Sequence, residues 1–183
     1  CGKPVTVVKE NDSEVLMCMN AGCKGKLLGE LNAFLGKKAH DINGLSEATL
    51  QLLIDTGLVA SPIDLYYLKD HSTELSRLPR MGAKKIANIL DSIESSRNTT
   101  IEKFIVGLNI PLIGGRAAKD IARYEEIRTR ESGMLYPFET FIKDAASDFN
   151  FTCIEGLGTE RNISIHRYFK ENRLFTELHI CPS

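Results

Sequence analysis

The stretch Ile154-Glu155-Gly156-Leu157-Gly158 is one of four segments that share a form: an apolar residue leads into a short turn, and a helical pattern follows. In chain order the segments are turn 1 (Ile42-Asn43-Gly44-Leu45-Ser46), turn 2 (Leu78-Pro79-Arg80-Met81-Gly82), turn 3 (Ile110-Pro111-Leu112-Ile113-Gly114) and turn 4 (residues 154–158). They recur at intervals of about 30–45 residues, the range expected for one supersecondary unit per repeat. The sequence therefore predicts repeated pairs of helices joined by tight turns.

Helical periodicity surrounds these turns. Apolar residues fall at i, i+3, i+4 and i+7 in two segments: Ile86, Ile89, Leu90 and Ile93, then Ile101, Phe104, Ile105 and Leu108. Ser61-Pro62 is typical of a helix start and opens a short helix through Leu68. Further helices are predicted at about 28–38, 47–56, 115–124, 138–147 and 159–170. The predicted fold class is mainly α, with residues 27–183 forming one helical domain.

The first 26 residues differ from the rest. Residues 4–8 and 14–17 favour strands and are separated by the turn-forming Asn11-Asp12-Ser13. A lone two-stranded ribbon is marginally stable, so it needs a staple. Cys18 and Cys23 have four residues between them, and Cys1 lies across the ribbon. This layout is typical of a structural zinc site, which needs four ligands. Only three are present, and we expect the fourth just upstream of Cys1.

Composition excludes several classes of protein. Hydrophobic residues make up 43% and charged residues 26% of the chain, which excludes a disordered segment. No apolar run reaches the roughly 18 residues that would span a membrane, so no membrane partner is expected. Five cysteines are too few for a disulfide framework and indicate a reducing, cytoplasmic location. We expect Cys153 and Cys181 to be small buried apolar residues.

The turns are candidate phosphate sites. A bare glycine lets a partner approach the backbone, and the first N–H groups of a helix attract anions. Because the net charge is −1, any contact with nucleic acid must be local. A β-branched residue at Gly158 is expected to strain its turn. The candidate DNA-binding residues are Gly44, Ser46, Arg80, Gly82, Lys84, Lys85, Gly114, Arg116, Lys119, Gly156, Gly158, Thr159 and Arg161.

These segments together resemble the C-terminal half of bacterial NAD-dependent DNA ligases. The resemblance rests on Cys1 to Pro4, Cys18 to Cys23, Asp41 to Leu45, Asp64 to Leu68, Gly82 to Leu90, Leu108 to Gly114 and Ile154 to Gly158. It implies a four-cysteine zinc finger (residues 1–26 here) followed by a domain of four helix-hairpin-helix motifs (residues 27–183) that grips duplex DNA around a nick. In the family pattern Cys1 is the second zinc ligand, and Cys18 and Cys23 are the third and fourth.

The chain departs from the family pattern at three turn positions. Ser46 replaces the second glycine of turn 1, and Arg80 and Leu112 occupy the first-glycine positions of turns 2 and 3. Those turns are expected to present fewer bare amides, so turn 4 fits the pattern best.

The resemblance also implies a parent enzyme that uses NAD and Mg²⁺ to seal nicks in DNA replication and repair. The family attaches AMP to a lysine in a Lys-x-Asp-Gly motif, which this sequence lacks. His40-Asp41 and Asp70-His71 lack a paired nucleophile or metal-ligand spacing, so we expect core or surface roles for them. This chain alone is expected to have no catalytic residue and no activity, and its partners are nicked duplex DNA and the remaining ligase domains.

Two other interpretations stay open from the residues alone. The chain can be a tandem helix-hairpin-helix module of another DNA repair or recombination protein, although the cysteine ribbon and Asp64-Leu65-Tyr66 weigh against this. It can also be a protein-interaction scaffold whose slightly acidic surface binds a protein partner. Binding to nicked duplex at low salt separates these classes.

Overall fold

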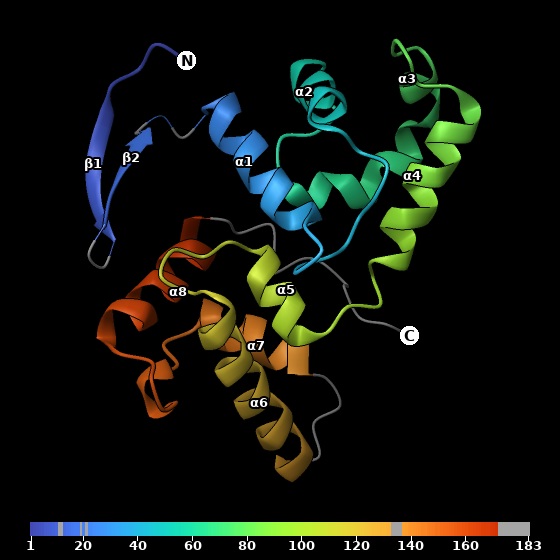
Figure 1. The fold of residues 1–183 in the computed structure, drawn as a ribbon. Helices are drawn as coiled ribbons and strands as arrows, with labels where there is room; N and C mark the ends of the chain where they lie inside the picture. Colours follow the sequence, from blue (N-terminus) through green and yellow to red (C-terminus); the bar gives the residue numbers. More distant parts are fainter. Residues whose placement is uncertain (11–12, 19, 21, 133–136, 172–183) are drawn as a thin grey trace.

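Helices make up most of the chain, in agreement with the predicted fold class. A computed structural model describes residues 1–10, 13–18, 20, 22–132 and 137–171. The first half contains α1 (Lys24–Leu35), α2 (Glu47–Asp55), the 3-10 helix η1 (Pro62–His71), α3 (Ser72–Ser76) and α4 (Ala83–Ser95). The second half contains α5 (Ile101–Gly107), α6 (Gly115–Ser132), α7 (Pro137–Ala146), the short 3-10 helix η2 (Phe151–Cys153) and α8 (Thr159–Glu171). Figure 1 shows the first half above the second.

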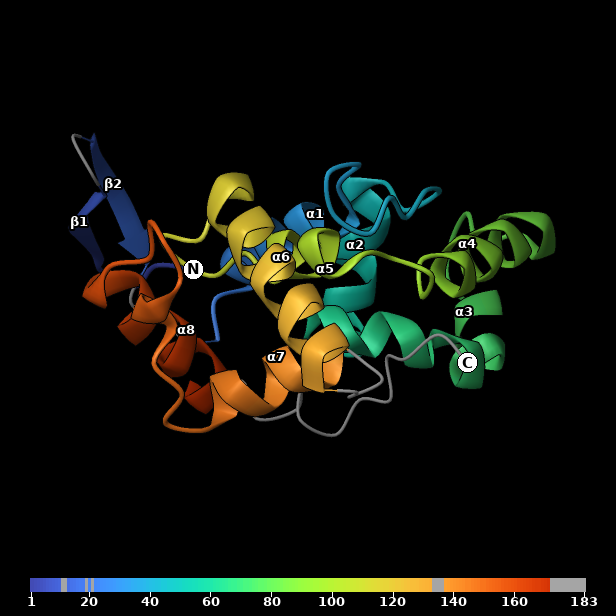
Figure 2. The same ribbon diagram turned by 90° about the horizontal axis from the view of Figure 1, so that it is seen from below.

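The N-terminal ribbon consists of β1 (Val5–Glu10) and β2 (Ser13–Cys18), paired antiparallel with Val5 opposite Cys18. The ribbon stands beside the helices at one end of the molecule (Figures 1 and 2). Side chains alternate between the faces of a strand, so Val5 and Val7 share a face, and Leu16 lies opposite Val7. All three are exposed. This face of the ribbon therefore gains little from burial, and the cysteine end can supply support.

The helices lie where the sequence periodicity predicts them. Where their ends differ from the predicted ends, the local sequence gives the reason. Helix α6 continues to Ser132 rather than ending near residue 124. Residues 125–132 contain several good helix formers and no glycine or proline, so nothing ends the helix earlier. The segment after Ser61 is a 3-10 helix rather than an α-helix. Its start is fixed by the Asp64 carboxylate, which accepts hydrogen bonds from the backbone N–H groups of Ala60 and Ser61 at 2.7 and 2.8 Å.

One apolar core runs through both halves. Its fully buried aromatic side chains are Phe34, Phe104, Phe141 and Phe151. The halves meet at His40, which is 4% exposed and stacks on Phe34 with ring centroids 3.9 Å apart. A methyl group at Gly107 of α5 would lie 2.6 Å from His40 Cδ2, so only a glycine allows this approach. His40 thus has the core role that the sequence predicted.

The hydrogen bonds around His40 define its tautomer. Ser96 Oγ donates to the Ile93 carbonyl at 2.6 Å, so the Tyr66 hydroxyl must donate to Ser96 across their 3.1 Å contact. Tyr66 Oη then accepts from His40 Nδ1 at 3.2 Å. Among the described residues, His40 Nε2 has no partner. Burial, which disfavours the charged ring, lowers the pKa of His40 to about 4.

We expect His40 to make stability depend on pH. The pKa of His40 is about 4 in the folded chain and 6.5, its ordinary value, in the unfolded chain. Between these pH values the unfolded chain is protonated at His40 and the folded chain is not. The contribution of neutral His40 to the free energy of unfolding is complete above pH 6.5. It falls by about 3 kcal/mol as the pH drops to 4. The measurement is the free energy of unfolding in urea from pH 4 to 8, as the difference between the wild type and His40→Gln.

That difference is needed because Glu125 acts in the opposite direction. Its carboxylate is fully buried, and burial raises its pKa to about 7. Its ionisation therefore lowers stability as the pH rises from 4.5 to 7. Parallel stability curves for the wild type and His40→Gln would show that His40 does not titrate in this way.

Candidate nucleic-acid interface and cysteine cluster

The four turns share one backbone geometry. The third residue of each has a positive φ: 91° at Gly44, 60° at Arg80, 67° at Leu112 and 84° at Gly156. In turns 2 to 4 the fourth residue's N–H donates to the first residue's carbonyl, at 3.3, 3.0 and 3.0 Å respectively. This hydrogen bond with a positive φ at the third residue is typical of a type II turn. Arg80 and Leu112 therefore adopt the glycine conformation despite their side chains.

Buried side chains hold each turn in place. The first and fourth residues enter the core: Ile42, Met81, Ile110, Ile113, Ile154 and Leu157 are buried, and Leu45 and Leu78 pack against the core. The fifth residue accepts the first hydrogen bond of the next helix, at 2.9 Å for Ser46, 3.0 Å for Gly82, 2.9 Å for Gly114 and 3.2 Å for Gly158. Each turn therefore ends at a helix N-terminus on the surface.

Three of these fifth residues leave the backbone bare. Gly82, Gly114 and Gly158 are exposed, and an added Cβ would meet no described atom within 4 Å. Their φ values are not positive, so the expected strain from a side chain at Gly158 is wrong. A side chain there would obstruct a partner rather than the fold. In turn 1, Ser46 Oγ instead accepts from Thr49 N–H at 3.3 Å.

Turns 1 and 2 form one pair. The Asn43 backbone N–H donates to Ser92 Oγ on α4 at 2.8 Å. Lys85 Nζ on α4 donates to Thr49 Oγ1 on α2 at 3.0 Å. A pocket between the turns is lined by Gly44, Gly82, Ala83, Lys84, Lys85 and Asn88.

Turns 3 and 4 form a second pair. Arg161 on α8 donates from Nε to the Leu112 carbonyl at 3.2 Å and from Nη1 to the Gly156 carbonyl at 2.6 Å. Ser164 Oγ donates to the Pro111 carbonyl at 2.6 Å. The first turn of each pair also follows a second residue of positive φ, Asp41 at 51° and Asn109 at 49°. The four turns are thus two copies of a two-turn unit.

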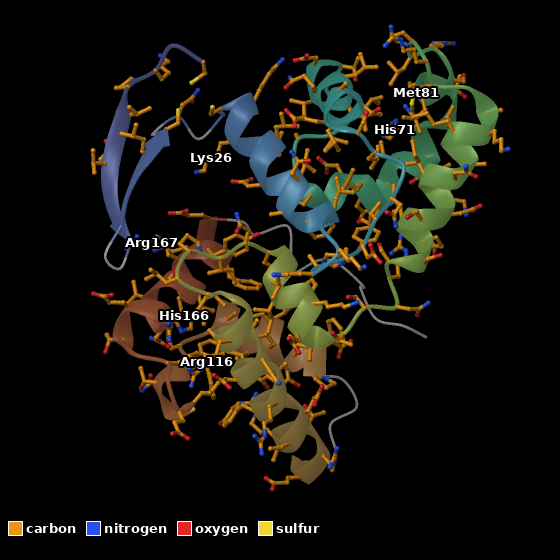
Figure 3. The ribbon with its side chains drawn as sticks, in the orientation of Figure 1. Lys26, His71, Met81, Arg116, His166 and Arg167 are labelled. Carbon is orange, nitrogen blue, oxygen red and sulfur yellow. The ribbon has the colours of Figure 1, made fainter. Side chains whose placement is uncertain are left out.

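The predicted basic residues divide into two groups. Arg80, Lys84, Arg116 and Lys119 are exposed. Lys85 and Arg161 are half-buried and donate to acceptors within the chain. Both stand three residues after the fifth residue of their turn, where the side chain faces the other turn of the pair. Figure 3 shows Arg116 at the N-terminal end of α6.

As candidate anion sites, the helix N-termini rank differently by charge than by their number of glycines. The first turns of α4 and α6 contain no acidic residue, whereas α2 has Glu47 and α8 has Glu160. A carboxylate at this end of a helix competes for the same N–H groups and dipole as an anion. Turns 2 and 3, one from each pair, are therefore the best anion sites, although turn 4 has the fuller glycine pattern.

A groove between α6 and turn 4 adds one residue that the sequence analysis missed. Arg116, Arg123 and Arg161 line it, together with the carboxylates Asp120 and Glu155. Arg123 is exposed and lies seven residues after Arg116, on the same face of α6. That spacing was the available signal for Arg123.

The two pairs face the same way. In Figure 2 the loop between α1 and α2, which carries turn 1, and the N-terminal end of α6 lie on the upper side of the molecule. Turn 2 lies against turn 1, and turn 4 against turn 3. This side therefore offers several helix N-termini to one extended partner.

The three N-terminal cysteines come together as predicted. The sulfur atoms of Cys1, Cys18 and Cys23 lie within 4.8 Å of one another, and those of Cys1 and Cys18 are 3.5 Å apart. Zinc–sulfur bonds of about 2.3 Å in a tetrahedron place sulfur atoms about 3.8 Å apart, so the cluster fits a zinc ion. The Lys26 backbone N–H, which hydrogen-bonds to Cys23, lowers the pKa of that thiol and favours the thiolate that a metal requires.

Cys153 does not join this cluster. Cys153 is exposed at the end of η2, so the expectation that it is buried is wrong. Its helix is only one turn long and leads straight into the exposed turn 4. Cys181 lies outside the described residues.

Within the part of the chain that the structure describes, no helix combines the length and hydrophobicity that crossing a membrane requires.

Sequence comparisons find DNA ligases. The chain is 32% identical over 174 residues to a DNA ligase of Thermosipho africanus, covering 94% of the chain and 24% of the ligase. It is 35% identical over 157 residues to a DNA ligase of Carboxydothermus hydrogenoformans (85% and 22%), and 38% identical over 125 residues to one of Onion yellows phytoplasma (68% and 19%). No protein-family model matches the chain. The chain thus spans about a quarter or less of the length of the ligases it matches.

The turn geometry predicts that glycine is the more stable residue at two equivalent positions. Arg80→Gly should raise the free energy of unfolding by about 0.5–1 kcal/mol, because a side chain in the left-handed region costs more than the entropy of glycine. Gly156→Ala should lower it by about 1 kcal/mol. Gly115→Ala, inside α6 with open space around it, serves as a control and should not destabilise. Urea unfolding measures all three, and a stabilising Gly156→Ala would contradict the assigned geometry.

The cysteine cluster predicts weak metal binding by this 183-residue chain. Three thiolates leave one position of a structural zinc site open, so zinc should be lost to a competing chelator. Metal analysis after dialysis should find less than one zinc per chain, and Cys23→Ser should lower it further. The control Cys153→Ser should have no effect. One tightly held zinc per monomer would show that another residue completes the site.

Proposed function

Because the chain is related to a segment of the bacterial DNA ligases, we propose that it is the DNA-binding region of such a ligase, of the NAD-dependent class. Its four turns are helix-hairpin-helix motifs that hold nicked duplex DNA while other domains seal the nick. The observation that carries this proposal is the pair of bare, acid-free helix N-termini at turns 2 and 3.

Backbone N–H groups supply the main contacts. At Gly82 and Gly114 a phosphate can approach the main chain without meeting a side chain, and the helix dipole favours its charge. Lys84 and Arg116 each stand two residues further on, exposed, where they can pair with the same phosphate. Such contacts grip the DNA backbone and read no bases. Binding is therefore independent of sequence, as nick sealing requires.

The remaining exposed candidates extend this surface. Arg80 lies within turn 2, Lys119 lies one helical turn beyond Arg116, and Thr159 offers a hydroxyl beside Gly158. Arg123 lengthens the basic path along α6. Because the whole chain carries a net charge of −1, attraction is confined to these points.

The zinc ion serves the ribbon rather than the reaction. Cys1, Cys18 and Cys23 tie the open end of the ribbon to the start of α1, which supports a pair of strands with exposed apolar side chains. Residues 1–26 form the zinc finger and residues 27–183 the helix-hairpin-helix domain. NAD, Mg²⁺ and the adenylated lysine belong to other domains of the parent enzyme, which works in replication and repair in the bacterial cytoplasm.

The experiment is DNA binding to a nicked duplex as a function of salt. Each phosphate contact contributes about 0.9 to the slope of log K against log salt. Lys84→Ala and Arg116→Ala should each flatten that slope by about one unit and weaken all DNA sequences equally. Lys69→Ala, an exposed lysine on η1 outside the four turns, is the matched control and should leave the slope unchanged.

A second variant separates binding from folding. Gly114→Val places a branched side chain where the protein has open space, so the unfolding free energy should change by no more than about 1 kcal/mol. Affinity should nevertheless fall, because the side chain blocks the approach of a phosphate. If all three variants fold and bind nicked duplex as the wild type does, the turns are architectural, and a protein-interaction scaffold is the better explanation.

A further inference from the structure

We propose that Arg161 is a positioning residue, which sets turn 3 for DNA by holding it against turn 4, and that turn 4 acts mainly as this brace. The inference rests on the proposed function. It also revises the prediction that Arg161 contacts phosphate directly.

Arg161 bridges two equivalent backbone sites. Its Nε and Nη1 atoms donate to the carbonyls of Leu112 and Gly156, the positive-φ residues of turns 3 and 4. A planar guanidinium presents its donors in a fixed fork, so it fixes both the distance and the angle between the two turns. A lysine offers a single centre and cannot do the same.

The held peptide lies next to the proposed contact. The Leu112 carbonyl belongs to the peptide that joins Leu112 to Ile113, directly before Gly114 and the first N–H groups of α6. Leu112, like Arg80 in turn 2, has a positive φ without glycine's freedom, so its conformation needs support from its surroundings. Ser164, one helical turn after Arg161, adds a second bond to the Pro111 carbonyl.

Turn 4 itself is a poor phosphate site. Glu160 stands in the first turn of α8, at the position equivalent to Lys84 and Arg116. In the first pair, Lys85 occupies the same repeat position as Arg161 and also donates within the chain, to Thr49 Oγ1 on α2. This position is therefore used within the chain in both units.

The experiment compares Arg161→Lys with Arg161→Ala. Positioning predicts that both lose about tenfold in affinity for nicked duplex, because the fork to two carbonyls is lost in each. Arg161→Lys should keep the wild-type salt slope. A phosphate contact predicts instead that the lysine retains most of the affinity and that the alanine flattens the slope by about one unit.

Hydrogen exchange gives a readout that does not depend on DNA. The Ile113 and Leu157 amides close turns 3 and 4 through bonds of 3.0 Å each, and they should exchange at least about tenfold faster in Arg161→Lys. The Met81 amide closes turn 2 and should be unchanged, which serves as an internal control. Ser164→Ala should produce a smaller change of the same kind, and it keeps the test available if Arg161→Ala does not fold.

The outcomes separate the two proposals. Wild-type exchange at Ile113 together with a flattened slope in Arg161→Ala would overturn the positioning role. Wild-type affinity in Arg161→Lys would also overturn it. Unchanged binding by Lys84→Ala and Arg116→Ala would instead reject the DNA-binding function, while the exchange of Ile113 would still report whether Arg161 holds the turns.

Discussion

A left-handed residue between two buried side chains is the constraint on which the structure depends. The first and fourth residues of each turn enter the core, and the chain reverses between them through a third residue with a positive φ. The fifth residue then has to start a helix at the surface. Because this order is repeated, the core-forming residues themselves determine where bare N–H groups meet solvent. Stability and the proposed binding surface therefore come from the same few positions.

The pairing of turns explains how a slightly acidic chain can present local regions of positive potential. Within each unit, one turn has an acid-free helix start and the other carries a carboxylate in its helix. Hydrogen bonds between turn 1 and α4, and between turn 3 and α8, fix the two turns of each pair relative to each other. One turn of a pair can thus serve as support, and the charge needed for an anion is confined to the other. Overall charge is a poor guide to function in such a design.

The sequence predicted the turns, the helices and the cysteine cluster because each depends on local spacing. It could not separate Lys84 from Lys85: adjacent residues point about 100° apart on a helix, and which one faces inward depends on where the partner turn lies. The contact of Arg161 with turn 3 could not be foreseen for the same reason, since its acceptor Leu112 lies 49 residues away in the sequence. The exposure of Cys153 likewise depends on packing around turn 4, which no periodicity encodes.

The two units act as one surface only if the halves of the chain keep a fixed relation, and a buried histidine belongs to the core that joins them. His40 stacks on Phe34 of the first half, bonds to Tyr66, and lies under Gly107 of the second. Because its Nε2 atom has no acceptor among the described residues, this contact holds only for the neutral ring. Turns 2 and 3 flank that junction along the chain. The close approach of α5 to His40 is therefore one of the contacts that hold the two proposed binding turns in their relative positions.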